Sequence, residues 1–142
     1  MAIPIDVADS LVAELNAAQL SQPLQAVRGY VPEYDLKEMK SLRVTVVPRE
    51  LSVTSVSRDR LSYDAQVDIA VQQKFAKGDN PEIDPLVNLV EEIADLFRLK
   101  RLASYPAAIW TKTEHRVLYS PEHWIELRQF TSLLTLTFKV VR

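Results

Sequence analysis

The chain has 142 residues, of which 17 are basic and 19 acidic, and its formal net charge is −2. Because the two signs are interspersed, the chain has no overall field to attract nucleic acid or an anionic membrane, which disfavours a dedicated DNA-binding role. Hydrophobic residues make up 47% and charged residues 25%, as in ordinary folded proteins. The length suits a single core, so we expect one domain over residues 1–142.

The absence of cysteine excludes several kinds of chemistry. Disulfides, thiolate catalysis and thiolate metal sites are impossible, and the fold must be stabilised by packing, which suits assembly in the cytosol. The first six residues lack the basic and apolar regions of a signal peptide, and no apolar run approaches the roughly 20 residues that span a bilayer. We therefore expect no export by a signal peptide and no membrane segment.

The first element in the chain is predicted to be a helix that ends near residues 19–21. Asp6 is its expected N-cap, because a carboxylate can accept from the free amides of the first turn. The apolar stripe that indicates this helix recurs at spacings of four, four and three. Its members are Val7, Leu11, Leu15 and Ala18.

Strands are expected between this helix and the middle of the chain. A short strand is predicted at residues 27–31 and a second at residues 42–47, where Pro48 is expected to end it. The charged residues 33–41 between them predict a connecting loop. Residues 63–75 alternate most clearly and predict a strand with one buried and one wet face. We expect residues 51–57 to pair with this strand as a hairpin.

A turn at residues 77–81 precedes the most clearly patterned helix. Asp84 is the expected cap and Pro85 the expected first helical residue. The break at Pro106 is expected to end it, after three basic residues that would complement the helix dipole. These are Arg98, Lys100 and Arg101. Its apolar face consists of Leu86, Leu89, Val90, Ile93, Leu96 and Phe97.

The last part of the chain predicts a long hairpin. Residues 108–119 alternate without interruption, residues 120–123 are the expected turn, and residues 127–141 are the return strand. The buried face of the return strand is expected to carry Phe130, Leu134, Leu136, Phe138 and Val140. The predicted fold is therefore α+β, with a mainly antiparallel sheet packed against two helices and a long C-terminal β-hairpin.

Candidate catalytic and metal-binding residues are few. His115 and His123 each follow an acid, but no third ligand stands at a diagnostic spacing, and exposed strand and turn positions explain both. Glu91, Glu92 and Asp95 lie on the polar side of an amphipathic helix, where a solvated face is the simpler interpretation. With two glycines in the chain, no glycine-rich phosphate loop is available. We expect no catalytic residue, no cofactor and no metal.

Protein contacts are a better candidate than chemistry. The long predicted strands would leave open edges unless another chain pairs with them, so assembly through strand pairing is expected. Aromatic residues near the predicted strand ends and turns could be core residues or interface anchors, and the sequence leaves both possibilities open. They are Tyr30, Tyr34, Trp110 and Trp124.

The order of these elements resembles the tail terminator and tail completion proteins of long-tailed bacteriophages. The resemblance covers essentially the whole chain. Its most specific portion is the helix that begins at Asp84 and Pro85, followed by residues 110–142. Within that portion, residues 128–136 read Arg-Gln-Phe-Thr-Ser-Leu-Leu-Thr-Leu and resemble the closing strand of those proteins.

The resemblance implies a non-enzymatic virion component assembled in the cytoplasm of a bacterial host. It would form a homo-oligomeric ring, commonly a hexamer, that caps the tail tube and joins it to the head connector. DNA would pass through the lumen without specific binding. Loops are the expected contact regions, since loops on a rigid frame usually carry recognition. The candidate interface residues are Arg58, Asp59, Arg60, Lys37, Lys40, His123 and Trp124.

Other classes of protein remain open at this point. One is another neck, connector or minor tail protein, which could share the same architecture. A second is a small α+β interaction module that binds one partner without forming a ring. A third is a ligand-binding or enzymatic domain, which would need the fold to bring Glu114, His115 and Tyr119 together at a pocket.

Overall fold

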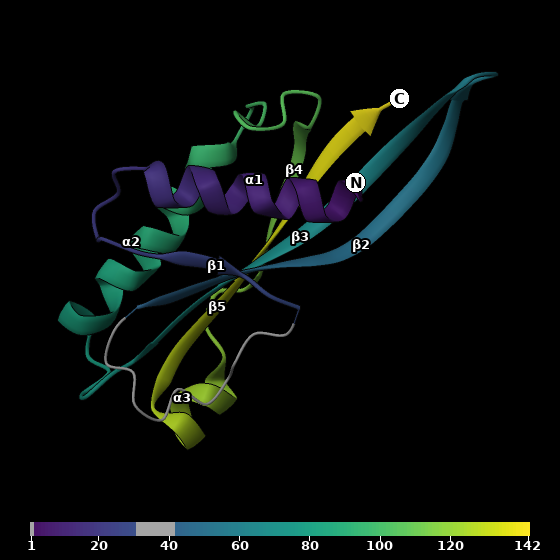
Figure 1. The fold of residues 1–142 in the computed structure, drawn as a ribbon. Helices are drawn as coiled ribbons and strands as arrows, with labels where there is room; N and C mark the ends of the chain where they lie inside the picture. The colour runs from purple at the N-terminus through teal and green to yellow at the C-terminus, as the bar shows by residue number, and fades with distance from the viewer. Residues whose placement is uncertain (1, 31–41) are drawn as a thin grey trace.

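The computed structural model describes residues 2–30 and 42–142, which form three helices and five strands (Figure 1). In chain order these elements are α1 (Ile3–Ala17), β1 (Ala26–Arg28), β2 (Arg43–Ser57), β3 (Arg60–Lys74), α2 (Asn80–Phe97), β4 (Ile109–Val117), α3 (Pro121–Leu127) and β5 (Gln129–Val141). The five strands form one sheet in the order β1-β2-β3-β5-β4. Only the pairing of β1 with β2 is parallel. The predicted α+β fold is confirmed.

Helices α1 and α2 cover one face of the sheet and enclose the hydrophobic core with it (Figure 1). The pattern of β3 and β5 explains why, because alternate residues of each strand are apolar and fully buried. In β5 the predicted buried set of Phe130, Leu134, Leu136, Phe138 and Val140 is confirmed. Phe138 meets Phe97 of α2 edge to face, with ring centroids 6.4 Å apart. The more polar face of the sheet therefore lies on the side away from this core.

Both long helices begin earlier than the sequence pattern predicts. The N-cap of α1 is Ala2, which makes no side-chain cap, and Asp6 lies in the first turn. The prediction that Asp84 caps α2 is also wrong. Asp79 is the N-cap, and its carboxylate accepts from the backbone N–H of Glu82. Pro85 lies inside the helix, whose first residue is Asn80.

The second helix also ends earlier than predicted. It stops at Phe97, with no basic residue in its last turn, and Leu99 follows with a φ of 60°. The three basic residues expected to complement the dipole therefore lie beyond the helix. The backbone turns at Leu99 so that Trp110 N can donate to the carbonyl of Lys100. The chain thus reaches the sheet through a tight return that local patterns did not indicate.

The strand predicted to stop at Pro48 instead runs through it. Strand β2 has 15 residues and pairs with β3 along its length, with a bulge between Pro48 and Glu50. Alternate residues of a strand direct their backbone N–H and C=O groups to the same edge. The Val46 carbonyl accepts from the backbone N–H of Gly29, so the backbone nitrogen of Pro48 also faces the β1 edge. Strand β1 ends there, and an edge position tolerates the missing N–H of proline. The predicted pairing of residues 51–57 with the long strand is confirmed.

The C-terminal pairing of β4 with β5 is confirmed, but two of its details are corrected. The expected turn at residues 120–123 is the start of helix α3, which Ser120 caps by accepting from His123 N. The alternation of β4 is interrupted by irregularities between Trp110 and Lys112 and between His115 and Val117. Each interruption moves the following side chains to the other face. The loop predicted at residues 33–41 lies outside the described residues.

Candidate assembly surfaces

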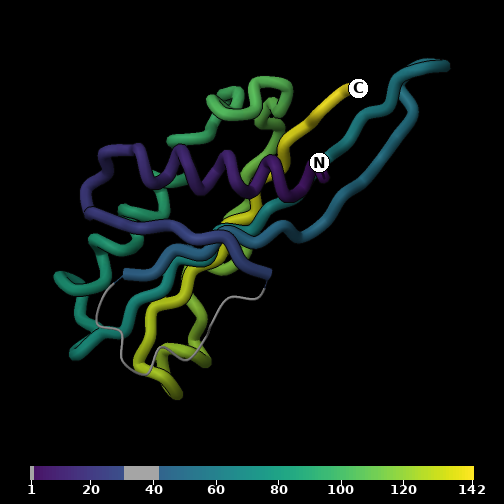
Figure 2. Tube along the Cα trace, in the orientation of Figure 1, coloured from purple at the N-terminus to yellow at the C-terminus, as the bar shows by residue number. Residues whose placement is uncertain are grey.

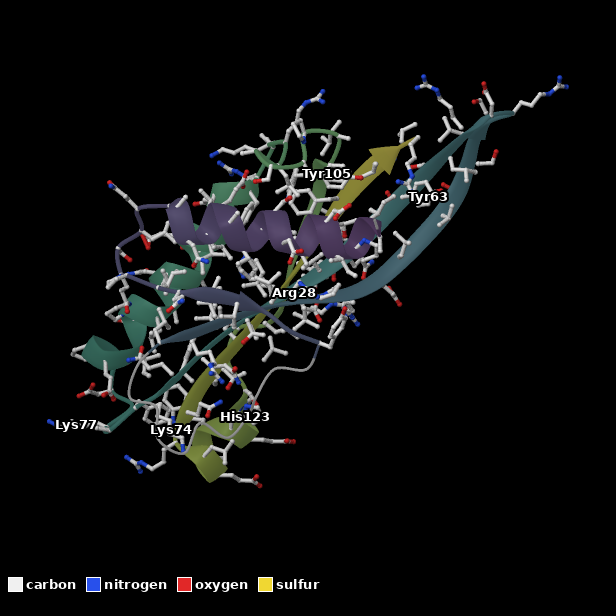
Figure 3. All side chains as sticks on the ribbon, viewed as in Figure 1. Arg28, Tyr63, Lys74, Lys77, Tyr105 and His123 are labelled. Atoms are coloured by element: carbon white, nitrogen blue, oxygen red, sulfur yellow. The ribbon has the colours of Figure 1, made fainter. Side chains whose placement is uncertain are left out.

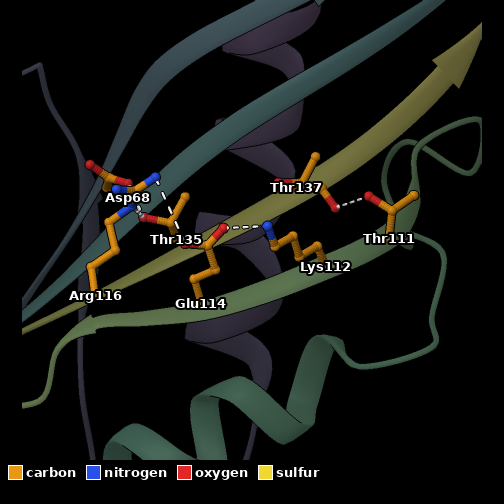
Figure 4. Close-up of polar contacts among 7 residues, drawn as sticks. All are labelled: Asp68, Thr111, Lys112, Glu114, Arg116, Thr135 and Thr137. Carbon is orange, nitrogen blue, oxygen red and sulfur yellow. Dashed lines mark hydrogen bonds and ion pairs between the residues drawn. The ribbon is translucent and has the colours of Figure 1, made fainter.

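A chain of polar contacts crosses the face of the sheet opposite α1 and α2 (Figure 4). Asp68 of β3 is its most buried charged residue, with a side chain 15% exposed. Its Oδ1 accepts from the Thr135 hydroxyl at 2.7 Å, and its Oδ2 lies 3.8 Å from Arg49 Nε. Thr135 Oγ1 in turn accepts from Arg116 Nε at 2.9 Å. Four strands are thereby joined through their side chains.

The same chain of contacts continues along β4. Glu114 Oε1 lies 2.6 Å from Lys112 Nζ, and its Oε2 lies 3.9 Å from Arg116 Nη2. The hydrogen bond from Lys112, the charge of the same ammonium group and that of Arg116 lower the pKa of Glu114, and partial burial opposes them. The carboxylate is therefore held ionised between two cations. Such a group is a poor general base, because a lowered pKa weakens its affinity for a proton.

The hairpin of β2 and β3 extends beyond the helices that cover the rest of the sheet (Figure 2). Strand β2 has 15 residues, about 50 Å at a rise of roughly 3.3 Å, whereas the 15 residues of α1 span about 22 Å. Residues 49–61, which we call the distal arm, are exposed throughout. They include four large apolar side chains, each at least 40% exposed. These are Leu51, Val53, Val56 and Leu61.

The distal arm is amphipathic. Val53 pairs with Tyr63 and Leu51 with Ala65, so these side chains continue the apolar face of the core beyond α1. The opposite face of the arm is polar, where Ser52 pairs with Asp64. Strand β1 pairs with β2 only as far as Val46, so no described strand covers the outer edge of the arm. An apolar face and an open edge therefore lie together.

A second exposed apolar surface lies where α2 begins beside α3. We call it the α2–α3 groove; its lining includes Ile83, Asp84, Val87, Leu118, Tyr119, Trp124 and Ile125. Trp124 lines the groove, and its ring centroid lies 4.5 Å from that of Phe75 and 5.5 Å from that of Tyr119. Ile125 is 79% exposed and Leu118 46%. The groove thus offers apolar contacts that the chain does not cover with its own described residues.

The turn before α2 holds the groove in shape. The Glu82 carboxylate accepts from three successive backbone amides, those of Ala76, Lys77 and Gly78. These hydrogen bonds, the one from Gly78 foremost, lower the pKa of Glu82. Gly78 has a φ of 71°, and an added Cβ would come within 3.1 Å of Trp124. The turn is therefore held to α2 by hydrogen bonds and lies against Trp124 of α3.

The residues predicted as interface candidates fall in two separate places. Arg58 and Asp59 form the tip of the distal arm and Arg60 begins β3, whereas His123 and Trp124 belong to α3. Figure 3 places His123 at the opposite end of the molecule from Tyr63, the residue that pairs with Val53 of the arm. His123 Nδ1 lies 2.9 Å from Thr131 Oγ1. The other two candidates, Lys37 and Lys40, lie outside the described residues.

The residues considered for an enzymatic site are not brought together. Glu114 and His115 are neighbours on β4, but they pair with Thr135 and Leu134, which point to opposite faces of the sheet. Tyr119 packs on Trp124 instead. Among residues 2–30 and 42–142, no group of three or more metal-ligating side chains is present. Sequence reasoning missed the exposed apolar residues of the arm, because it ended the strand at Pro48, whereas β2 continues to Ser57.

The fold defines a two-layer α+β protein with two helices on one face of a sheet and a more polar face on the other, where Thr45, Gln72 and Thr135 are nevertheless buried. This arrangement is similar to the cryo-EM structure of the sheath/tube terminator of an extracellular contractile injection system, PVC, in its extended state. The TM-score is 0.53 and the sequence identity 19%. All of this chain is covered, but it spans 57% of that chain. The expected resemblance to tail terminators is confirmed for the fold.

Two other comparisons found nothing similar. No family model matches the chain, and no curated protein matches it. Within the described residues, no helix is both long and apolar enough to cross a membrane.

Proposed function

We propose that this chain is a tail-terminator subunit, a structural protein that forms a ring at the end of a tail tube. The observation that carries the proposal is the similarity of fold over the whole chain to a sheath/tube terminator. The form of the molecule supports it, because the exposed surfaces suit contacts with protein. Within residues 2–30 and 42–142, they are a strand edge that no strand covers and two separate apolar patches.

The ring would be a homo-oligomer of six copies. Its subunits would associate through surfaces that the monomer leaves open, and closing a ring covers such edges. The ring would cap the tube and connect it to the head connector of a virion, and DNA would pass through its lumen without sequence recognition. The arm tip, with Arg58, Asp59 and Arg60, and helix α3, with His123 and Trp124, would supply contact residues.

The solution mass of the purified protein tests this proposal. Light scattering should be measured from micromolar to near-millimolar concentration, and the sample should be imaged by electron microscopy. A discrete oligomer near six subunits that persists on dilution, with ring-shaped particles, is the expected result. A monomer at every concentration would contradict self-assembly into a ring.

A further inference from the structure

We propose that the subunits associate head to tail, with the distal arm of one copy seated in the α2–α3 groove of the next. The inference rests on the proposed function, because it names the contact that would build the ring. The two surfaces lie at opposite ends of the molecule (Figure 1). A copy cannot therefore fill its own groove with its own arm, but its arm can reach the groove of a neighbour.

The two surfaces match in apolar character. The arm presents Leu51, Val53 and Leu61, each between 40% and 48% exposed. The groove presents Leu118, Tyr119 and Ile125, between 46% and 79% exposed. Apolar patches of this kind on a folded protein usually mark interaction sites. Seating one in the other would remove both from water, which stabilises association roughly in proportion to the apolar area covered.

The charges at the two surfaces are complementary. Arg58 and Arg60 lie exposed at the arm tip with one acid, Asp59, between them. Asp84 lines the groove, and Glu122 and Glu126 are exposed on α3.

Two cations near the groove, Arg128 and Lys77, partly oppose the attraction of a basic arm tip. Arg128 donates to the carbonyl of Ala76, and its guanidinium lies 5.8 Å from the centre of the Phe75 ring. Lys77 is exposed in the preceding turn. Asp84 is the charged side chain among the described residues that line the groove, so a basic arm tip would be attracted there.

A contact between two different patches is heterologous, so each copy still has one free patch after it binds a neighbour. Repeating it adds copies in one direction, and the series closes into a ring when the rotation per step allows. A contact of the arm with a second arm would instead give a dimer. The two arrangements are therefore distinguishable by which residues of two copies become neighbours.

Cross-linking tests this pairing directly, because the natural chain has no cysteine and only introduced thiols react. One preparation carries Val53→Cys and the other Ile125→Cys; both positions are exposed, so folding should be retained. A short bismaleimide is added to each variant alone and to the mixture. We expect the mixture to give at least fivefold more covalent dimer than either variant alone. A chain carrying both substitutions should give a ladder of oligomers.

A matched control uses Leu99→Cys mixed with Ile125→Cys, because Leu99 is 80% exposed and lies beyond the end of α2. This mixture should give little dimer. Raising the salt concentration should lower the yield of the Val53 and Ile125 pair, since exposed charges are screened. Arg58→Glu with Arg60→Glu should also lower it, and adding Asp84→Arg with Glu126→Arg on the groove copy should restore it.

The inference and the proposed function fail in different ways. Rings without cross-links between positions 53 and 125 would overturn the head-to-tail contact and leave the terminator proposal standing. Dominant linking of position 53 to itself would show an arm-to-arm contact and also overturn the inference. A monomer with no cross-link above the control would contradict both.

Discussion

Replacing Gly78 by alanine should destabilise the protein strongly, because two separate costs meet at this residue. The backbone has a φ of 71°, a conformation that L residues rarely adopt. The added Cβ would lie 2.9 Å from Phe75 Cε1 and 3.1 Å from Trp124 Cζ2. Neither ring can move away easily, because the two rings pack on each other with centroids 4.5 Å apart.

The magnitude follows from these two costs. A left-handed backbone costs an L residue roughly 1–2 kcal/mol, and forcing a methyl group into a packed site costs about 1–3 kcal/mol. Alanine also restricts the unfolded chain, which offsets about 0.4–1 kcal/mol. We therefore expect Gly78→Ala to lower the free energy of unfolding by about 1–4.5 kcal/mol.

Urea unfolding followed by circular dichroism measures this loss, with the slope against urea expected to stay unchanged. The other glycine supplies a matched control. A Cβ at Gly29 would lie 3.6 Å from Thr45 Cγ2, an ordinary contact, and the backbone there is not left-handed. Gly29→Ala should therefore be neutral or should stabilise by up to about 1 kcal/mol.

A double variant separates the two costs at Gly78. If Trp124→Leu and Phe75→Leu are introduced first, much of the steric cost should vanish, and Gly78→Ala should then cost at most about 1.5 kcal/mol. A loss smaller than about 0.5 kcal/mol for Gly78→Ala in the natural background would refute the reasoning, because ordinary surface substitutions already fall in that range.

Three further predictions use single substitutions at other residues. Three backbone amides lower the pKa of Glu82 from 4.5, so its contribution to stability is full above that value and is lost as the pH falls through the lowered pKa. Glu82→Gln should therefore destabilise the protein at pH 7 and weaken the acid dependence of the urea midpoint. An unchanged acid dependence would refute this. Asp79→Ala should lower the free energy of unfolding by about 1 kcal/mol because it removes a helix cap. Asp84→Ala should change it by no more than about 0.5 kcal/mol. Equal losses for the two variants in urea unfolding would contradict the observed helix start. Gln72→Met should stabilise by about 1 kcal/mol, read as a higher thermal midpoint, because both amide atoms of Gln72 are buried and have no hydrogen-bond partner among the described residues.

The sequence alone predicted the elements whose signal is local and repeated. The alternation of β3 and β5 reflects a strand with one buried face, and the buried residues found there agree with it. The apolar face of α2 was predicted for the same reason, because Leu86, Leu89 and Ile93 recur at helical spacing and are buried. Together with the order of the elements, these patterns sufficed for the fold class.

Boundaries were not predictable in the same way, because neighbouring residues competed for one role. Asp79 and Asp84 each precede a proline within two residues and are both plausible caps. The choice depended on Glu82, which reaches back to the amides of Ala76, Lys77 and Gly78 and holds the turn that starts the helix at Asn80. Pro48 was likewise ambiguous, because its effect depends on whether a neighbouring strand needs its N–H.

The tertiary structure alone decided the candidate surfaces. The sequence singled out Arg58 to Arg60 and His123 with Trp124, but only the fold placed the two groups at opposite ends of the molecule (Figure 3). The contact of Asp68 with Thr135 joins residues 67 positions apart, and no local pattern encodes it. Periodicity follows from the geometry of a single helix or strand and can be read along the chain. Pairing, register and exposure depend on which distant segments meet, and only the folded chain brings those segments together.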